Sequence, residues 1–173
     1  MSGILYVFAG SSNGRTSTFG VEYRGPNPWP ATNMNQEILA YLKSQRVGVF
    51  AIEMLDGSPH AATVHYANTD GPVFIFETDR VYRKSEPLLA RKESRASMVV
   101  GSNEGDMKTL QLDGIASMIA EDSPLLETYF AKFPEKKAKY APPKSLFFTF
   151  TPTWWRFTDW TKPKGKTIAT SND

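Results

Sequence analysis

Short apolar runs separated by turn residues dominate this chain from residue 35 onward, and polar and apolar positions alternate within several of them. A period of two is typical of half-buried β-strands. Two strong turn sequences, Asp56-Gly57 and Asn68-Thr69-Asp70-Gly71, separate neighbouring runs and predict hairpins. The predicted strands cover residues 47–55, 60–68, 72–78, 96–102, 107–120 and 145–160, with a break at Pro152.

Three segments between these strands carry helical signals. Residues 35–45 place apolar side chains on one face at helical spacing, which predicts an amphipathic helix. Ser85 and Ser123 stand at expected N-caps, and Pro124 follows Ser123 at a first helical position. The expected helices therefore cover residues 35–45, 86–92 and 125–133.

The order of these elements predicts the fold class. Hairpin connections dominate, so we expect a mostly antiparallel sheet and a mainly β (α+β) protein. Six strongly twisted strands close into a small barrel, with helices covering the gaps. Gly114 interrupts an alternating run and predicts a kink or a bulge.

Residues 1–33 do not share this pattern. They hold five of the 12 glycines and three of the 12 prolines without a sustained period, which indicates loop or extended coil. The segment also resembles the peptide obtained by translating through a transfer-RNA gene, so we hypothesise that the native start is Met34. The alternative is a genuine disordered arm that wraps a partner subunit. We divide the chain into this extension, a domain over 34–161 and a polar, frayed tail over 162–173.

Composition narrows the class of protein. The chain has 173 residues, of which 40% are hydrophobic and 22% charged, as in one globular domain. A net charge of +2 gives no overall attraction to nucleic acid or anionic membrane, and no apolar run approaches the roughly 20 residues of a membrane span. The absence of cysteine excludes a thiolate nucleophile and fits a reducing compartment, so we expect a cytoplasmic protein.

The candidate chemistry gathers at residues 74–85. An apolar strand ends there in Thr78, and Arg83, Lys84 and Ser85 follow at the approach to a helix. Hydroxyl groups, cations and free backbone N–H groups at a helix start are what a phosphate monoester requires. The alternative interpretation is a solvated basic turn, because charge runs are usually solvated.

Five pieces of the chain resemble a known family when taken in order. DGSPHAATVHY, DGPVFIFET, RKSEPLL, ASMVVG and LQLDGIASM are similar to the FMN-binding split β-barrel family of pyridoxamine 5′-phosphate oxidase, most closely its general stress protein branch. The resemblance covers residues 35–161 and implies an antiparallel six-stranded split β-barrel with flanking helices. It implies that FMN binds at a dimer interface, with Thr78, Arg83 and Lys84 as phosphate ligands and Ser85 beside them.

The resemblance also implies roles for residues outside this turn. The strand that carries His60 and Ala62 matches the one that passes the flavin ring, and Thr109 or Gln111 matches a polar group near the phosphate. Trp155 is a candidate for lining the flavin pocket, although aromatic residues at 154–160 also suit core and dimer packing. The oxidase's arginine on its second strand and its substrate-binding C-terminal segment have no convincing match. Flavin binding is therefore implied more strongly than oxidation of pyridoxamine phosphate.

We therefore expect a homodimer that binds FMN non-covalently at two symmetric sites and exchanges electrons or hydride with a small-molecule donor or acceptor. We expect no bound metal, and neither nucleic acid nor membrane as a partner. The alternative is a non-catalytic stress protein that carries or senses flavin, deazaflavin or haem, with His60 as the candidate haem ligand. His60 and His65 are five residues apart on a strand and are expected on opposite faces.

Overall fold

The computed structural model describes residues 34–101, 103–140 and 142–171. Its helices are α1 (Gln36–Ser44), α2 (Glu86–Ala90), α3 (Leu125–Lys132) and α4 (Pro134–Lys137), with short 3-10 turns η1 (Arg83–Ser85) and η2 (Glu104–Asp106). Its strands are β1 (Val47–Glu53), β2 (Pro59–His65), β3 (Ala67–Asn68), β4 (Phe74–Asp79), β5 (Glu93–Val100), β6 (Lys108–Met118), β7 (Ser145–Asp159) and β8 (Thr167–Thr170). The expectation for residues 1–33 lies outside the described residues.

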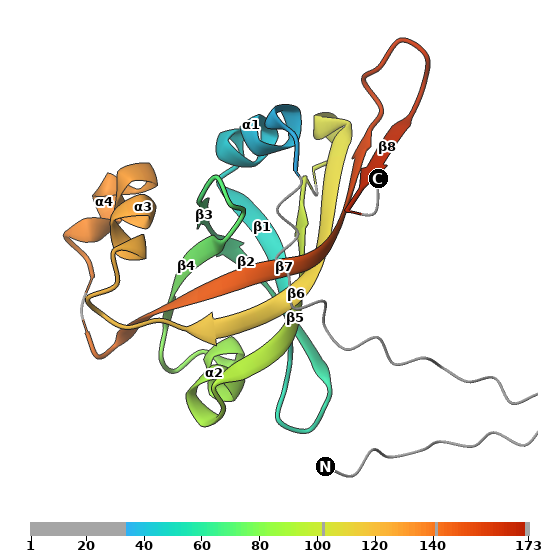
Figure 1. The fold of residues 1–173 in the computed structure, drawn as a ribbon. Helices are drawn as coiled ribbons and strands as arrows, with labels where there is room; N and C mark the ends of the chain where they lie inside the picture. Colours follow the sequence, from blue (N-terminus) through green and yellow to red (C-terminus); the bar gives the residue numbers. More distant parts are fainter. Residues whose placement is uncertain (1–33, 102, 141, 172–173) are drawn as a thin grey trace, which may run out of the picture.

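All eight described strands belong to one antiparallel sheet in the order β2-β1-β5-β6-β7-β4-β3, with β8 paired to β7. The sheet curls until β2 lies against β4 without joining its ladder, so the barrel is split there (Figure 1). Helices α1 and α2 lie at opposite ends of the barrel, and α3 packs beside β3 and β4. The predicted split-barrel class is confirmed.

The structure has more strands than the six predicted. The run predicted over 60–68 is divided at Tyr66 into β2 and β3, which pair with different strands. The sequence predicts a frayed tail after Lys162, whereas the structure pairs β8 with the end of β7. Both differences arise from pairing between distant segments, which local periodicity does not encode.

Helix α1 follows its sequence signals closely. The side chain of Asn35 accepts a hydrogen bond from the Ile38 N–H at 3.0 Å, which satisfies one of the donors left free at a helix start. Its apolar face, predicted from spacing, buries Ile38 and Leu42 completely in the barrel end. The helix ends at Ser44, where the chain turns into β1.

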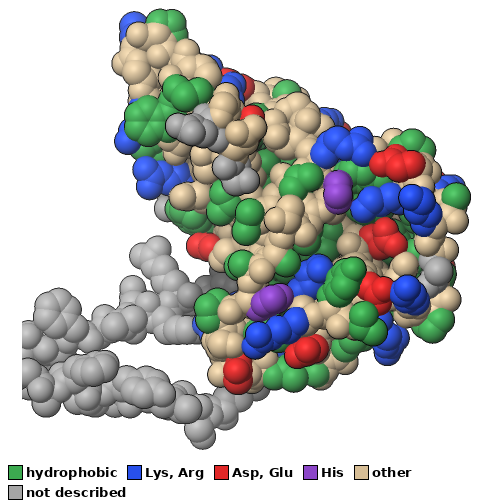
Figure 2. All heavy atoms as spheres, turned by 180° about the vertical axis from the view of Figure 1, so that it is seen from behind, with side chains coloured by type: hydrophobic (Ala, Val, Ile, Leu, Met, Phe, Trp, Pro, Cys, Tyr) green, Lys and Arg blue, Asp and Glu red, His purple; other side chains and the backbone are tan. Residues whose placement is uncertain are grey.

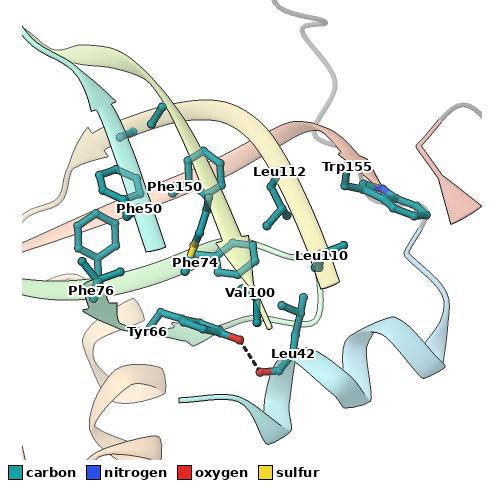
Figure 3. Close-up of a cluster of buried hydrophobic side chains, with 14 of the residues drawn as sticks. Leu42, Phe50, Tyr66, Phe74, Phe76, Val100, Leu110, Leu112, Phe150 and Trp155 are labelled. Carbon is teal, nitrogen blue, oxygen red and sulfur yellow. Dashed lines mark hydrogen bonds between the residues drawn. The ribbon is translucent and has the colours of Figure 1, made fainter. Parts of the chain in front are cut away.

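The barrel interior is filled mainly by aromatic rings from facing strands (Figure 3). The rings of Phe50 and Phe76 lie 4.7 Å apart between centroids, within the range in which aromatic pairs stabilise a core. Tyr66 is fully buried, and its hydroxyl donates to the Leu42 carbonyl at 2.9 Å. That bond satisfies the one polar atom of a large buried ring and joins α1 to the barrel.

Strand β7 runs unbroken over 15 residues, so the predicted break at Pro152 is wrong. The ladder shifts register here: Asp113 of β6 pairs with Trp154 and Gly114 pairs with Pro152, so Thr153 of β7 is the extra residue of a bulge. A Cβ atom on Gly114 would lie 2.8 Å from the Pro152 Cα and closer still to the Thr151 carbonyl oxygen. Only glycine therefore fits at the bulge that the sequence predicts at this position.

A second hydrophobic cluster lies outside the barrel between α3 and the strands β3, β4 and β7. It contains Tyr129, Phe130 and Phe133 of the helical segment packed on Ile75 and Phe147 of the sheet. Lys132 fastens this cluster to α1, because its ammonium group donates to the Gln45 carbonyl at 2.5 Å. Burial, with a further contribution from Arg46, lowers the pKa of Lys132 to about 8.

An ionic cluster joins α1 to the ends of β6 and β7. Asp159 has no exposed side-chain surface, and one carboxylate oxygen accepts from the Thr161 N–H at 2.8 Å and from its hydroxyl at 2.6 Å. The other oxygen lies 3.3 Å from the Lys108 Nζ and 3.6 Å from the Lys162 Nζ, while both lysines also face Glu37. Burial raises the pKa of Asp159, but these partners outweigh it and hold the pKa at about 2.

None of the described helices combines the length and the apolar character that crossing a membrane requires.

We expect Asp159 to stabilise the fold by about 2 kcal/mol at neutral pH, because its pKa of about 2 lies below the ordinary aspartate value of 3.8. A carboxyl group whose pKa is lowered on folding stabilises the protein above its unfolded pKa. The contribution is lost as the pH falls from about 4 to about 2. Urea unfolding of the wild type and of Asp159→Asn across that range measures it. A stability difference that stays constant over the range contradicts the assignment.

We expect Gly114→Ala to destabilise the protein by about 1–3 kcal/mol, because the added methyl group overlaps the β7 backbone at the bulge. Thermal unfolding measures the loss. Gly71→Ala is the matched control, because no atom lies within 4 Å of a Cβ built at Gly71. Equal melting temperatures for the two variants would show that the bulge tolerates a side chain.

Candidate functional site

The turn between β4 and α2 closes on itself through the backbone. The Tyr82 N–H donates to the Asp79 carbonyl at 3.1 Å, and the Ser85 N–H donates to the Tyr82 carbonyl at 2.8 Å. The hydroxyl of Ser85, which is fully buried, donates to the Asp79 carbonyl at 2.9 Å. These bonds fold η1 back against the end of β4 and bring Arg83 and Lys84 to the strand that carries Thr78.

Ser85 therefore differs from its expected role as a helix cap. It occupies the N-cap position of α2, but its backbone is already helical and its side chain makes no capping bond. The hydroxyl is engaged inside the turn. Ser85 fastens the turn, and its side chain is not presented to a ligand.

Thr78 carries the most informative polar atom of the site. The residue is 5% exposed, and its hydroxyl oxygen has no hydrogen-bond partner in the structure. A buried hydroxyl without a partner is destabilising by about 1–3 kcal/mol, so such groups are uncommon unless they serve a ligand. The hydroxyl group of Thr78 at the end of β4 therefore has a hydrogen-bonding capacity that the described chain does not use.

The two cations of the turn have different surroundings. Arg83 is exposed and faces the β1–β2 hairpin, where its charge adds to hydrogen bonds from Ser58 in lowering the pKa of Asp56. Lys84 is half-buried, and among the described residues its ammonium group contacts the Tyr82 ring and no carboxylate. Burial lowers the pKa of Lys84, so the cation lacks both full hydration and a counter-charge.

Strand β2 faces this turn across the split of the barrel. His60 and Ala62 lie on the face of β2 that points toward the interior, and both are half-buried. Arg91 at the end of α2 donates to the carbonyls of Glu53 and Met54, at 2.7 and 2.9 Å, and so holds the β1–β2 hairpin beside the turn. The structure thus brings His60 and Ala62 near the predicted phosphate ligands.

Three other predicted residues lie elsewhere in the chain. Thr109 and Gln111 alternate with the buried Leu110 and Leu112 on β6, so they occupy the outer face of the sheet. Trp155 is 3% exposed and packs into the core at the end of the cluster opposite Phe76 (Figure 3). A single copy of the chain does not gather these residues with the turn.

His60 and His65 point to opposite faces of β2, as predicted. The His65 ring meets the Phe133 ring edge-on with centroids 5.6 Å apart. Burial and the nearby charges of Lys136 and Arg46 hold the pKa of His65 below its ordinary value. Within the described ranges no three histidine, aspartate or glutamate side chains gather in a way that could hold a metal ion.

The outer face of β1, β5 and β6 carries a hollow of about 500 Å³. Its polar lining is internally paired, with Arg95 Nε 2.6 Å from a Glu53 oxygen and the Ser97 hydroxyl donating to Asp113 at 2.7 Å. On the face shown in Figure 2, Lys and Arg side chains alternate with Asp and Glu side chains. This mixture differs from the basic stripe that nucleic-acid-binding proteins present.

An antiparallel barrel split between β2 and β4, with a basic turn at the split, defines a protein of the split-barrel class. The family model described as pyridoxamine 5′-phosphate oxidase matches residues 34–159, which is most of the chain. The chain belongs to this family.

Solved structures agree on the fold. A protein assigned as general stress protein 26 from Jannaschia sp. CCS1 is 18% identical with a TM-score of 0.61, and the match covers 78% of this chain and 94% of that one. A protein assigned as pyridoxamine 5′-phosphate oxidase from Listeria innocua is 20% identical with a TM-score of 0.55, over 70% and 94% of the two chains. The heme storage protein HutZ of Vibrio cholerae is 18% identical with a TM-score of 0.54, over 67% and 87%. No curated protein sequence matches the chain.

Two contacts at the site were not predicted from the sequence. Sequence reasoning did not single out Tyr82, whose ring centroid lies 4.4 Å from the Lys84 Nζ. It also missed the approach of Asp56 to Arg83, which depends on the fold. The alternation of Thr109 and Gln111 with leucines does place these two residues opposite the core.

We expect Thr78→Val to stabilise the protein by about 1 kcal/mol, because it removes a buried hydroxyl that has no partner. Thr149→Val is the matched control. The Thr149 hydroxyl, on a residue that is also buried, donates to the Ser117 carbonyl at 3.3 Å, so its removal should destabilise. Urea unfolding of the ligand-free protein measures both changes. A loss of stability in both variants would mean that the Thr78 hydroxyl is satisfied within the fold.

Proposed function

We propose that the chain is an FMN-binding oxidoreductase of the pyridoxamine 5′-phosphate oxidase-like family. One observation carries the proposal: the buried Thr78 hydroxyl has no partner at the point where η1 folds back on β4. A hydroxyl group that donates to a phosphate oxygen would gain the hydrogen bond that the chain itself does not supply.

The charges of the turn support the same ligand. A phosphate oxygen is a suitable counter-charge for the half-buried ammonium group of Lys84, which has no carboxylate neighbour among the described residues. Arg83 adds a second cation with donors arranged for phosphate oxygens. Thr78, Arg83 and Lys84 would therefore hold the phosphate, and Ser85 would keep their turn in shape.

When bound, FMN supplies the hydride or electron transfer through its ring system. The chain contributes anchoring of the phosphate and a wall beside the ring. The inward face of β2 with His60 and Ala62 supplies that wall, since it is half-buried and faces the turn across the split. The reaction partner is a small-molecule electron donor or acceptor.

The proposal includes a homodimer with flavin at the interface. The outer face of β1, β5 and β6 carries a hollow and side chains of both signs of charge. An isologous contact requires such a self-complementary surface. Thr109 and Gln111 lie on this face and would reach a flavin only across the interface with a second copy.

A second candidate function is binding without turnover. The family fold is shared with the heme storage protein HutZ and with a heme binding protein of Mycobacterium smegmatis, both below 20% identity. His60 offers a half-buried ring nitrogen beside the split, which would suit a haem carrier or sensor as the alternative. Oxidation of reduced nicotinamide with an electron acceptor, measured on the flavin-loaded protein, separates an enzyme from a carrier.

We expect Arg83→Ala and Lys84→Ala each to weaken FMN binding by about 1.5–3 kcal/mol, the scale of a charge-assisted hydrogen bond. Quenching of flavin fluorescence in titrations of the full chain measures the affinity. Riboflavin lacks the phosphate, so its affinity should stay unchanged in both variants. Lys164→Ala, which changes an exposed lysine outside the site, is the control for net charge.

Unchanged FMN affinity in the double variant Arg83→Ala/Lys84→Ala would remove the phosphate assignment. An absorption spectrum after incubation with FMN and desalting gives the first indication. A protein that stays colourless with FMN but acquires a haem spectrum that His60→Ala abolishes would favour the alternative.

A further inference from the structure

We propose that Tyr82 is a positioning residue for the anion site: its ring holds the Lys84 ammonium group in the place where that group meets the phosphate. The inference rests on the proposed function, because it assigns a role to Tyr82 in the same site. Neither a hydrogen bond from the Tyr82 hydroxyl nor burial of its ring is needed for this role.

The contact itself is direct. The Lys84 Nζ lies 4.4 Å from the centroid of the Tyr82 ring, within the roughly 6 Å over which a ring face attracts a cation. Among the described residues this ring is the contact that the ammonium group makes, and no ion pair competes for it. The ring therefore determines where the charge of Lys84 rests before a ligand arrives.

The backbone fixes the two residues relative to one another. The Tyr82 N–H and carbonyl are both engaged, the first with the Asp79 carbonyl and the second with the Ser85 N–H. Ser85 is anchored in turn through its hydroxyl. Tyr82 and Lys84 thus project from a closed turn, and the spacing of their side chains does not depend on a mobile loop.

The exposure of Tyr82 shows that its ring is not held by core packing. Its side chain is 54% exposed beside Val81, which is 81% exposed. A large aromatic ring kept at the surface of a basic turn is explained by what it touches there.

The contact with the Tyr82 ring restricts the position of the Lys84 ammonium group before a ligand binds. A lysine side chain loses considerable rotamer freedom when its ammonium group is fixed by a ligand. A ring that restricts the ammonium group in advance reduces that loss, as preorganisation does in general. For a partly exposed ring we expect an effect on FMN affinity of about two- to five-fold.

The first test needs no flavin. A proton near the face of an aromatic ring resonates upfield, so the ε-CH₂ protons of Lys84 should be shifted in the NMR spectrum of the ligand-free protein. Lys84→Met identifies the resonance by its disappearance. We expect the shift to persist in Tyr82→Phe, which keeps the ring, and to vanish in Tyr82→Leu. A Lys84 signal at the ordinary lysine position in the wild type would overturn the proposal.

The second test measures coupling between the two residues. Tyr82→Leu should weaken FMN binding about two- to five-fold and leave riboflavin binding unchanged, whereas Tyr82→Phe should bind FMN like the wild type. In a Lys84→Met background, Tyr82→Leu should have no further effect. An equal effect of Tyr82→Leu with and without Lys84 would mean that the ring supports the turn itself and would overturn the positioning role.

The two tests keep the proposals apart. Lys84→Met with unchanged FMN affinity would refute both Lys84 as a phosphate ligand and the role of Tyr82, whereas unchanged affinity in Arg83→Ala/Lys84→Ala would refute the phosphate site as a whole. Lys84→Met with weakened FMN binding, together with unchanged binding in Tyr82→Leu, would leave the phosphate site in place and refute the role of Tyr82.

Discussion

The fold depends on one strand pairing with three others. Strand β7 pairs with β6 along most of its length, with β4 near its start and with β8 near its end. A straight 15-residue strand would not fit this curled sheet, because the strands of a barrel must tilt and bend. The bulge at Thr153 of β7, beside Pro152, supplies the bend, and the absence of a side chain at Gly114 permits the close approach of β6. The position of β4, and with it the turn that carries Arg83 and Lys84, follows from the pairing of β4 with β7.

Much of the fold could be predicted wherever the signal is local. The polar cap and apolar face of α1, the hairpin at Asp56-Gly57 and the bulge at Gly114 are each encoded within a few residues. The continuity of β7 through Pro152 could not be predicted, because it depends on the partner strand. The division at Tyr66 likewise depends on pairing between distant segments, since β2 pairs with β1 and β3 pairs with β4.

The candidate site follows the same division between local and distant signals. The strand end, turn and helix start between Thr78 and Ser85 could be predicted from residue types alone, since these elements are adjacent in sequence. The internal bond of the Ser85 hydroxyl and the burial of Trp155 became visible only in three dimensions. The unpartnered hydroxyl of Thr78 is a local disadvantage for the ligand-free chain. Residues that lower the stability of the ligand-free protein are common at functional positions.

The way in which the turn is fastened bears on how this family diversifies. Its shape is maintained by backbone groups and by Ser85, whereas Tyr82, Arg83 and Lys84 hold none of those bonds with their side chains. Substitution at these three positions can therefore alter the chemistry of the ligand without disturbing the strand and helix on either side. In a scaffold built in this way, the ligand can change while the shape of the turn stays the same. Such independence is compatible with the sharing of one fold by a protein named as pyridoxamine 5′-phosphate oxidase and a heme storage protein.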